Sequence, residues 1–162
     1  MPGCLVCYVR HFHVLQFHVL HFQSPHIERA VRRRVQRFDG VYAADRFPND
    51  PRLLVCNTDP SHKLGEHWVA IYVDEEGRYG EYFNSFGRPP PVTFRRYLDK
   101  HCMHWSYNGV QLQSVASPFC GHYCVLYCIL RSRGINMRNI VCSFTRDTGL
   151  NDVLVHGFVC VQ

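Results

Sequence analysis

The sequence of 162 residues contains no uninterrupted apolar run near the roughly 18 residues that a membrane-spanning helix requires. This absence excludes a protein that crosses a membrane on a helix. A charged start followed by an apolar core is also missing from the first residues, so we expect no secretory leader and a reducing compartment. Charged residues are scarce at 19% and hydrophobic ones reach 46%, which predicts one packed core rather than a disordered chain.

The sequence also lacks an even number of cysteines, since it has nine, so they cannot all pair in disulfides within the chain. A chain of this length forms a stable core without crosslinks, which argues against a disulfide scaffold. Free cysteine usually packs as a small buried hydrophobe, and we expect that of eight of the nine.

Positive charge is unevenly distributed along the chain. Residues 1–36 hold five of the 18 basic residues and one of the 13 acidic residues, so the remainder is close to neutral. The same segment holds five of the 11 histidines. We therefore predict a basic, histidine-rich N-terminal arm over residues 1–36, poorly ordered, followed by a globular domain over residues 37–162.

Two specific functional interpretations of this arm remain open, a zinc site and a nucleic-acid-binding segment. Cys4, Cys7, His11 and His13 offer a zinc ligand set, although the gap between cysteine and histidine is far shorter than in a zinc finger. The arginine-rich run 29–37 offers a nucleic-acid-binding arm instead.

Strand patterns precede helix patterns in the globular part, and this order is typical of the α+β class rather than of alternating βαβ units. A buried helix is the strongest single element, because its residues are apolar nearly all round. The predicted strands are 53–57, 68–73, 79–86 and an extended 105–113. The predicted helices are 92–102, 123–133 (the buried one), 138–146 and 151–160.

Cys120 lies where a Ser/Pro loop meets the predicted buried helix. Free backbone N–H groups and the positive end of the helix dipole favour a thiolate there, and Gly121 lets a substrate backbone approach. Without partners, the simpler interpretation of Cys120 is another packed cysteine.

His67 and Asn84 supply such partners. The hairpin predicted to turn at 74–77 places them at equal distances from its centre, side by side on neighbouring strands. Asn84 then accepts a hydrogen bond from one ring nitrogen of His67 and leaves the other for Cys120. Gln113, seven residues before Cys120, offers a side-chain amide for an oxyanion.

The ordered set of a His-Trp pair, a Phe-x-x-Phe-Gly segment, a glutamine and a Cys-Gly pair resembles the adenain-like cysteine proteases. This family comprises the adenovirus protease and its relatives in Maverick/Polinton-type transposons and related viruses. The resemblance spans about residues 38–160, and the matching segments are 40–48, 57–60, 65–70, 81–87, 112–114 and 120–124. Histidine precedes cysteine in this order, whereas papain-like enzymes have the cysteine first.

The resemblance implies an α+β, clan CE fold, in which helices pack on a central mixed sheet and the nucleophile begins a buried helix. It implies that Cys120 is the nucleophile, His67 the base and Gln113 the oxyanion donor. Asn84 falls where the family usually has a carboxylate. An asparagine still orients imidazole, but it does not stabilise imidazolium by charge.

The function implied by the resemblance is a cysteine-type endopeptidase that processes capsid-type structural precursors of a virus or transposon at small residues such as glycine. One alternative is a ubiquitin-like-protein isopeptidase of the same clan. Another is a catalytically impaired relic that acts as a binding module, because Asn84 replaces the usual acid.

The expected partners are a polypeptide substrate and no membrane, for a monomer without a metal or organic cofactor. By resemblance, an activating peptide and DNA are candidate activators, and Cys102 lies near the position of the activating thiol. A packed thiol is the simpler interpretation of Cys102, and a solvated face is the simpler interpretation of Arg95 and Arg96. The expected location is intracellular, in the host nucleus or cytoplasm or in the virion.

Overall fold

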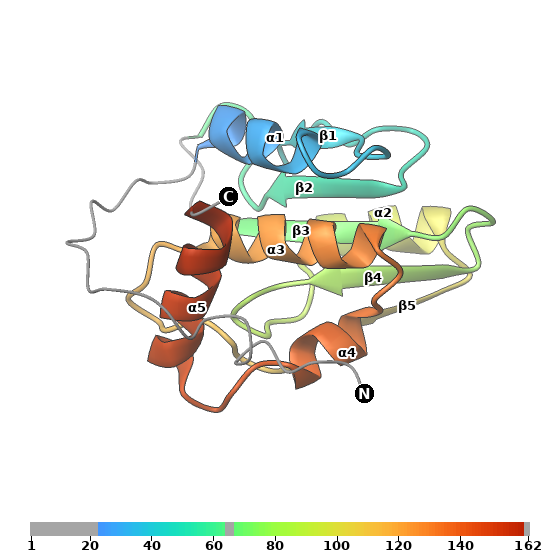
Figure 1. Cartoon of the computed structure of the whole chain (residues 1–162). Coiled ribbons are helices and arrows are strands. Elements are labelled where there is room, and N and C mark those ends of the chain that lie inside the picture. The colour runs from blue at the N-terminus through green and yellow to red at the C-terminus, as the bar shows by residue number, and fades with distance from the viewer. Residues whose placement is uncertain (1–22, 64–66, 161–162) are drawn as a thin grey trace.

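The computed structural model describes residues 23–63 and 67–160, and Figure 1 shows how their helices and strands are arranged. The strands are β1 (Gly40–Tyr42), β2 (Leu53–Asn57), β3 (Trp68–Val73), β4 (Tyr79–Phe83) and β5 (His104–Tyr107). The helices are α1 (Ser24–Arg32), α2 (Val92–His101), α3 (Cys120–Ser132), α4 (Met137–Cys142) and α5 (Thr148–Cys160). None of these helices combines the length and apolar character that crossing a bilayer needs.

The five strands form one mixed sheet in the order β1-β2-β3-β4-β5. The two outer pairs, β1 with β2 and β4 with β5, are parallel, and the two inner pairs are antiparallel. The predicted α+β class with a central mixed sheet is therefore confirmed. The three-residue strand β1 was not predicted, because it is too short to show a period of two.

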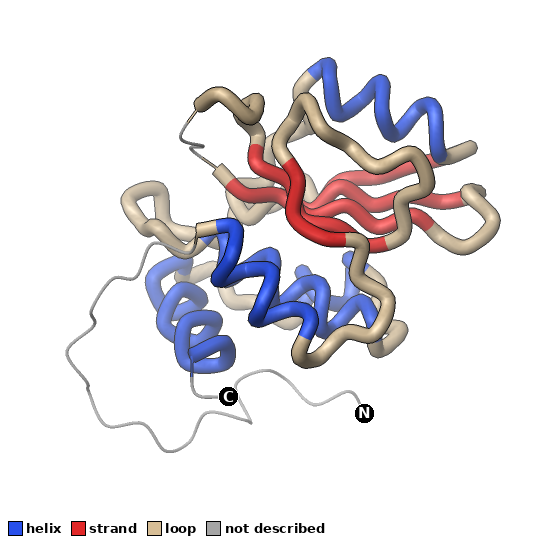
Figure 2. The backbone as a smooth tube through the Cα atoms, turned by 90° about the horizontal axis from the view of Figure 1, so that it is seen from above, coloured by secondary structure: helices blue, strands red, loops and turns tan. Residues whose placement is uncertain are grey.

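Helices cover both faces of the sheet. Figure 2 shows α2 on one side and the other helices on the opposite side. Side chains alternate along β2, so Leu53 and Val55 enter the core layer under α3, and Leu54 and Cys56 enter the layer under α2. All five residues of β2 are buried, because the strand is covered on both faces.

Helix α3 is the central helix of the larger layer, and the nine residues from Gly121 to Ile129 are all buried. It begins at Cys120, three residues before the predicted start, and ends before Gly134, whose φ of 83° suits a glycine. The first turn escaped prediction because Cys-Gly-His has little helical propensity of its own. The predicted placement of Cys120 at the start of a buried helix is confirmed.

A buried carboxylate fixes α3 against the sheet. Glu81 of β4, only 1% exposed, accepts a hydrogen bond from the Tyr127 hydroxyl at 2.6 Å and pairs with Arg131 at 3.0 Å. Its second oxygen accepts from the backbone N–H of Met137 at 3.2 Å, at the start of α4. One side chain thus joins β4, α3 and α4.

The N-terminal boundary differs from the prediction. Part of the segment assigned to a poorly ordered arm, residues 24–32, forms α1, and its Ile27 and Val31 are fully buried against the layer that contains α3. Val35 is also buried there. The globular part therefore begins near Ser24 rather than at residue 37, because an i, i+4 apolar pair gives this arginine-rich helix one face to bury.

The seven cysteines among the described residues are all free thiols, as expected. Four of them, Cys56, Cys102, Cys124 and Cys128, are buried as predicted. Cys142 and Cys160 are exposed, which corrects the expectation that every cysteine except Cys120 packs in the core.

Candidate active site

His67 and Asn84 contact each other at the ends of neighbouring strands. His67 immediately precedes β3, and Asn84 immediately follows β4. The Nε2 of His67 lies 2.8 Å from the Oδ1 of Asn84, and the same Oδ1 accepts the backbone N–H of Phe86 at 2.9 Å. Because that atom accepts from a backbone N–H, it is the oxygen, so Nε2 of His67 is the donor. The proton on Nε2 leaves a lone pair on Nδ1.

The register of the hairpin differs slightly from the prediction. Ala70 pairs with Phe83, so continuing the register places His67 opposite Phe86, with Asn84 as its diagonal neighbour. The centre of the hairpin lies one residue later than predicted. Diagonal neighbours share a face of the sheet, so the predicted contact forms despite the shift. The ring of Phe86 packs against the His67 ring, with centroids 4.8 Å apart and planes tilted by 30°.

A tight turn after β4 sets the position of Asn84. The N–H of Gly87 donates to the Asn84 carbonyl at 2.7 Å, and Gly87 has a φ of 66°. A Cβ at this glycine would lie 2.4 Å from the backbone of Val110, so only glycine fits the turn.

Asn108 holds the main chain of Asn84 from the next strand, and sequence reasoning missed this residue. Its Oδ1 accepts the backbone N–H of Asn84 at 2.8 Å, and its Nδ2 donates to the Asn84 carbonyl at 2.7 Å. Asn108 is 7% exposed and directly follows β5. Asn108 falls inside the extended segment predicted for 105–113, and its partner is invisible without the β4–β5 pairing.

Cys120 lies next to the start of β3. Burial raises the pKa of the Cys120 thiol, and contacts with the backbone N–H groups of Trp68, Gly121 and Cys120 itself lower it by less, so the net shift is upward. The sequence had favoured the anion at this helix start. The correction is that burial outweighs the three N–H groups, so the thiol rests protonated. The contact with the N–H of Trp68 places the sulfur within one residue of His67.

The second ring nitrogen of His67, Nδ1, is free to accept a proton near the Cys120 thiol. Nδ1 is buried and has no hydrogen-bond partner among the described residues. Burial lowers the pKa of His67, while the hydrogen bond to Asn84 raises it by less, so the ring is neutral near pH 7. No hydrogen bond joins it to the Cys120 thiol within the described ranges. A buried acceptor without a donor is unusual and points to a chemical role.

Gln113 is fully buried at the same end of the sheet. Its Oε1 accepts from the hydroxyl of Ser85 at 2.6 Å, and its Nε2 donates to the Ser117 carbonyl at 2.6 Å, with the Ser117 hydroxyl at 3.2 Å. Ser85 follows Asn84, and Ser117 lies in the loop that leads into Cys120. The structure therefore brings Gln113 between these two segments, with its amide turned toward the loop.

Cys102 lies away from the other predicted site residues. It directly follows α2 and is buried in the layer on the opposite face of the sheet, where its sulfur packs on Gly80. Burial raises its pKa to about 11. Arg95 and Arg96 are exposed on α2. The proposed zinc ligands Cys4, Cys7, His11 and His13 lie outside the described residues, and so does the predicted arm up to residue 22.

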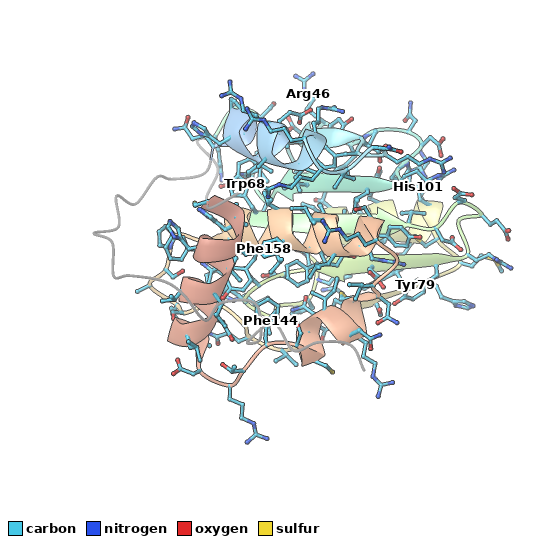
Figure 3. All side chains as sticks on the ribbon, in the orientation of Figure 1. Arg46, Trp68, Tyr79, His101, Phe144 and Phe158 are labelled. Atoms are coloured by element: carbon cyan, nitrogen blue, oxygen red, sulfur yellow. The ribbon has the colours of Figure 1, made fainter. Side chains whose placement is uncertain are left out.

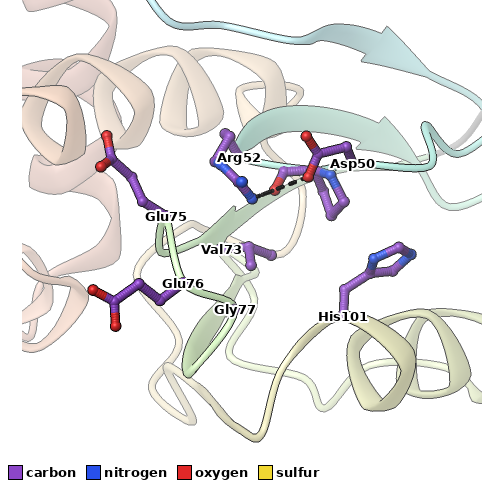
Figure 4. Close-up of a pocket in the computed structure, with 8 residues that line it drawn as sticks. Asp50, Arg52, Val73, Glu75, Glu76, Gly77 and His101 are labelled. Atoms are coloured by element: carbon purple, nitrogen blue, oxygen red, sulfur yellow. Dashed lines mark hydrogen bonds and ion pairs between the residues drawn. The ribbon is translucent and has the colours of Figure 1, made fainter.

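A polar pocket is present at the other end of the sheet (Figure 4). Asp50, Arg52, Val73 and His101 line it together with the turn after β3. His67 precedes β3 and Val73 ends it, so the pocket lies about 17–20 Å from the His67–Cys120 end. Figure 3 shows Trp68 and His101 near these opposite ends. The pocket therefore takes no part in the site around Cys120.

Comparison with known proteins gives relatives of one kind. The chain is 48% identical over 48 residues to a SUMO-1 cysteine protease from a South African tick isolate of African swine fever virus, covering 28% of this chain and 18% of the viral protein. It is 28% identical over 115 residues to the cysteine protease of a Malawian tick isolate, covering 64% of this chain and 42% of that protein. No protein-family model matches.

A crystal structure of the pS273R protease of this virus aligns with a TM-score of 0.48 at 25% identity, over 65% of this chain and 43% of the viral chain. The sequence matches establish homology to a viral cysteine protease and confirm the predicted resemblance at that level. The chain matches less than half the length of these relatives.

Proposed function

We propose that this protein is a cysteine endopeptidase in which Cys120 is the nucleophile and His67 is the general base. The observation that carries the proposal is the protonation pattern of His67. Asn84 binds the Nε2 proton, and the unprotonated Nδ1 is buried without a partner next to the strand start whose N–H contacts the Cys120 thiol. Homology to viral cysteine proteases supports the same assignment.

The reaction begins from a neutral pair, because burial raises the pKa of Cys120 and lowers that of His67. Nδ1 of His67 takes the thiol proton as the sulfur forms a bond to the substrate carbonyl carbon. The imidazolium then gives this proton to the amide nitrogen, and the carbon–nitrogen bond breaks to leave a thioester. Water, deprotonated by Nδ1, attacks the thioester, and the sulfur leaves and regains its proton.

The oxyanion of the intermediate is stabilised by the N-terminal end of α3 and by Gln113. The backbone N–H of Cys120 lies at the positive end of the helix dipole. Gln113 donates to Ser117 in the free protein, so a small movement of the loop before Cys120 is needed to present Nε2 to substrate. Once aligned with the oxyanion, a donor of this kind contributes about 2.7–4 kcal/mol to transition-state binding.

Asn84 orients the imidazole, and its neutral amide replaces the carboxylate usual in the family. It fixes the ring tautomer but adds no charge to stabilise imidazolium. The ring contact between Phe86 and His67 and the Asn108–Asn84 contacts hold the ring in place. The site is therefore assembled for activity, which favours an active enzyme over a relic that only binds.

The proposed substrates are capsid-type structural precursors cleaved after small residues such as glycine. A ubiquitin-like-protein isopeptidase is the second candidate, because relatives of this chain carry the name SUMO-1 cysteine protease. Both activities act on a glycine-containing tail with the same chemistry. We further propose an intracellular monomer in the host nucleus or cytoplasm, with an activating peptide or DNA as regulators.

Turnover assays distinguish these functions. A fluorogenic peptide with an internal Gly-Gly site and a SUMO precursor are each incubated with wild-type protein, Cys120→Ala and the matched control Cys142→Ala, whose thiol is exposed. The endopeptidase proposal predicts peptide cleavage by wild type and Cys142→Ala and none by Cys120→Ala. Cleavage of the SUMO precursor alone would favour a protease specific for ubiquitin-like proteins, the class to which the isopeptidase alternative belongs. Equal residual cleavage by all three would remove the catalytic assignment.

A further inference from the structure

A second group of ligand-type side chains lies on the far side of the first turn of α3. His122 is 1% exposed, two residues after Cys120, and it faces His156 and Cys160 near the end of α5. Nε2 of His122 is 3.7 Å from the Cys160 sulfur, and Nε2 of His156 is 3.6 Å from it. One ligand atom of each residue lies within 4.8 Å of the other two.

Two of the three separations in this cluster, those from sulfur to nitrogen, match tetrahedral zinc coordination, and the two imidazoles place ligand nitrogens within 4.8 Å of each other. Bonds of about 2.3 Å to sulfur and about 2.0–2.1 Å to nitrogen at the tetrahedral angle put the two ligand atoms about 3.6 Å apart. Both sulfur-to-nitrogen distances lie within 0.1 Å of that value. A thiol that donates to one imidazole while its sulfur accepts from the N–H of the other gives the same two contacts, so metal titration is the measurement that distinguishes the two arrangements.

The backbone preorganises the ligands. His156 and Cys160 are four residues apart on α5, so they share one face of the helix. His122 enters from α3, and the ring of Phe119 packs 5.1 Å from both imidazoles. Cys160 is exposed, so an ion can enter from solvent and keep a water in its fourth position.

We propose that His122, His156 and Cys160 form a zinc site that fastens α5 to the first turn of α3. The ion takes one sulfur and two nitrogen ligands and releases the thiol proton of Cys160. It plays no part in peptide cleavage, and the proposal does not depend on the protease assignment. Its effect is structural. The ion would hold the two histidines on which Phe119 packs, and Phe119 directly precedes Cys120, so the ion would steady the segment that leads into α3.

The test uses the full chain, reduced with a phosphine and stripped of metal by a chelator. Zn²⁺ is titrated by calorimetry, and Co²⁺ binding is followed by absorption, because a thiolate ligand gives Co²⁺ a charge-transfer band. Wild type is expected to bind one ion per chain with that band and to melt at a higher temperature with Zn²⁺. His156→Gln and Cys160→Ser are each expected to lose the stoichiometric ion, and Cys160→Ser also the thiolate band.

Matched controls locate the ion. His104→Gln and Cys142→Ser replace exposed residues of the same types outside the cluster, and both are expected to bind as wild type does. Cys120→Ala tests the candidate catalytic pair, and Cys4→Ser with Cys7→Ser tests the N-terminal cysteines. Binding that persists in His156→Gln and Cys160→Ser, or that is lost in these last variants instead, would overturn the proposal. Failure of wild type to bind would also overturn it.

Discussion

Asn108 holds Asn84 by two hydrogen bonds to its main chain, one received from the N–H and one given to the carbonyl. Asn84 in turn accepts the Nε2 proton of His67. The orientation of the proposed base thus depends on a residue that touches none of the reacting atoms. Two consecutive links, made by three hydrogen bonds, therefore run from Asn108 at the end of β5 through Asn84 to the imidazole.

Replacing Asn108 is therefore expected to impair catalysis through geometry. Asn108→Ala should lower kcat by about 10–100-fold with little change in KM, because small misplacement of catalytic groups carries penalties of this size. The exposed residue Asn49 provides the matched control, Asn49→Ala, which should behave as wild type. An unchanged kcat in folded Asn108→Ala would show that the turn at Gly87 and the Phe86 ring suffice to position Asn84 and His67.

The acid side of the pH profile reports on His67. The ring must be neutral to accept the thiol proton, and burial lowers its pKa from 6.5. Activity should therefore persist as pH falls through 6.5 and be lost only below it, where the imidazole becomes protonated. The measurement is kcat/KM against pH in wild type. An acid limb above pH 6.5 would contradict the buried, neutral base.

Asn84→Asp restores the charge usual in the family. A carboxylate next to the Nε2 proton favours imidazolium and raises the pKa of His67. The acid limb should shift to higher pH, and turnover at pH 8 should equal or exceed that of wild type. Asn84→Ala is the comparison, since it removes the acceptor and should lose turnover. A lower rate in Asn84→Asp across the whole pH range would contradict the role assigned to Asn84.

The buried Glu81–Arg131 pair predicts a large effect on stability rather than on chemistry. Glu81→Ala leaves Arg131, 13% exposed, without its carboxylate and should cost about 3–5 kcal/mol of unfolding free energy. Glu75 forms an ion pair with Arg37 at the surface, so Glu75→Ala should leave the melting temperature nearly unchanged. Chemical denaturation measures both. Equal stability of the two variants would show that Glu81 does not join the layers as described.

The fold was largely predictable from local patterns in the sequence. The strands at 53–57 and 68–73 have the predicted bounds, because apolar runs bounded by turn residues determine them. Helix α1 was missed because the arginines around it dominate the composition, although Ile27 and Val31 give the i, i+4 signal. Its burial depends on α3, which lies about 90 residues later in the chain.

The candidate site was predictable only where it follows one hairpin. The His67–Asn84 contact was predicted by counting residues from the centre of the hairpin. The contact forms although the predicted centre was wrong by one residue. Asn108 depends on the parallel pairing of β4 with β5, and His122 meets α5 only after two helices pack. No local pattern encodes such contacts. The roles of Cys120 and Gln113 remain predictions.

The most direct test of the central claim is covalent capture of the nucleophile. A peptide ending in Gly-Gly with a C-terminal vinyl sulfone is incubated with wild type, His67→Ala and Cys120→Ala, and the modified residue is identified by mass spectrometry. The account predicts one adduct, on Cys120 in wild type, formed at least about 100-fold more slowly in His67→Ala. Labelling of exposed Cys142 at the same rate as Cys120, or equal rates in wild type and His67→Ala, would contradict it.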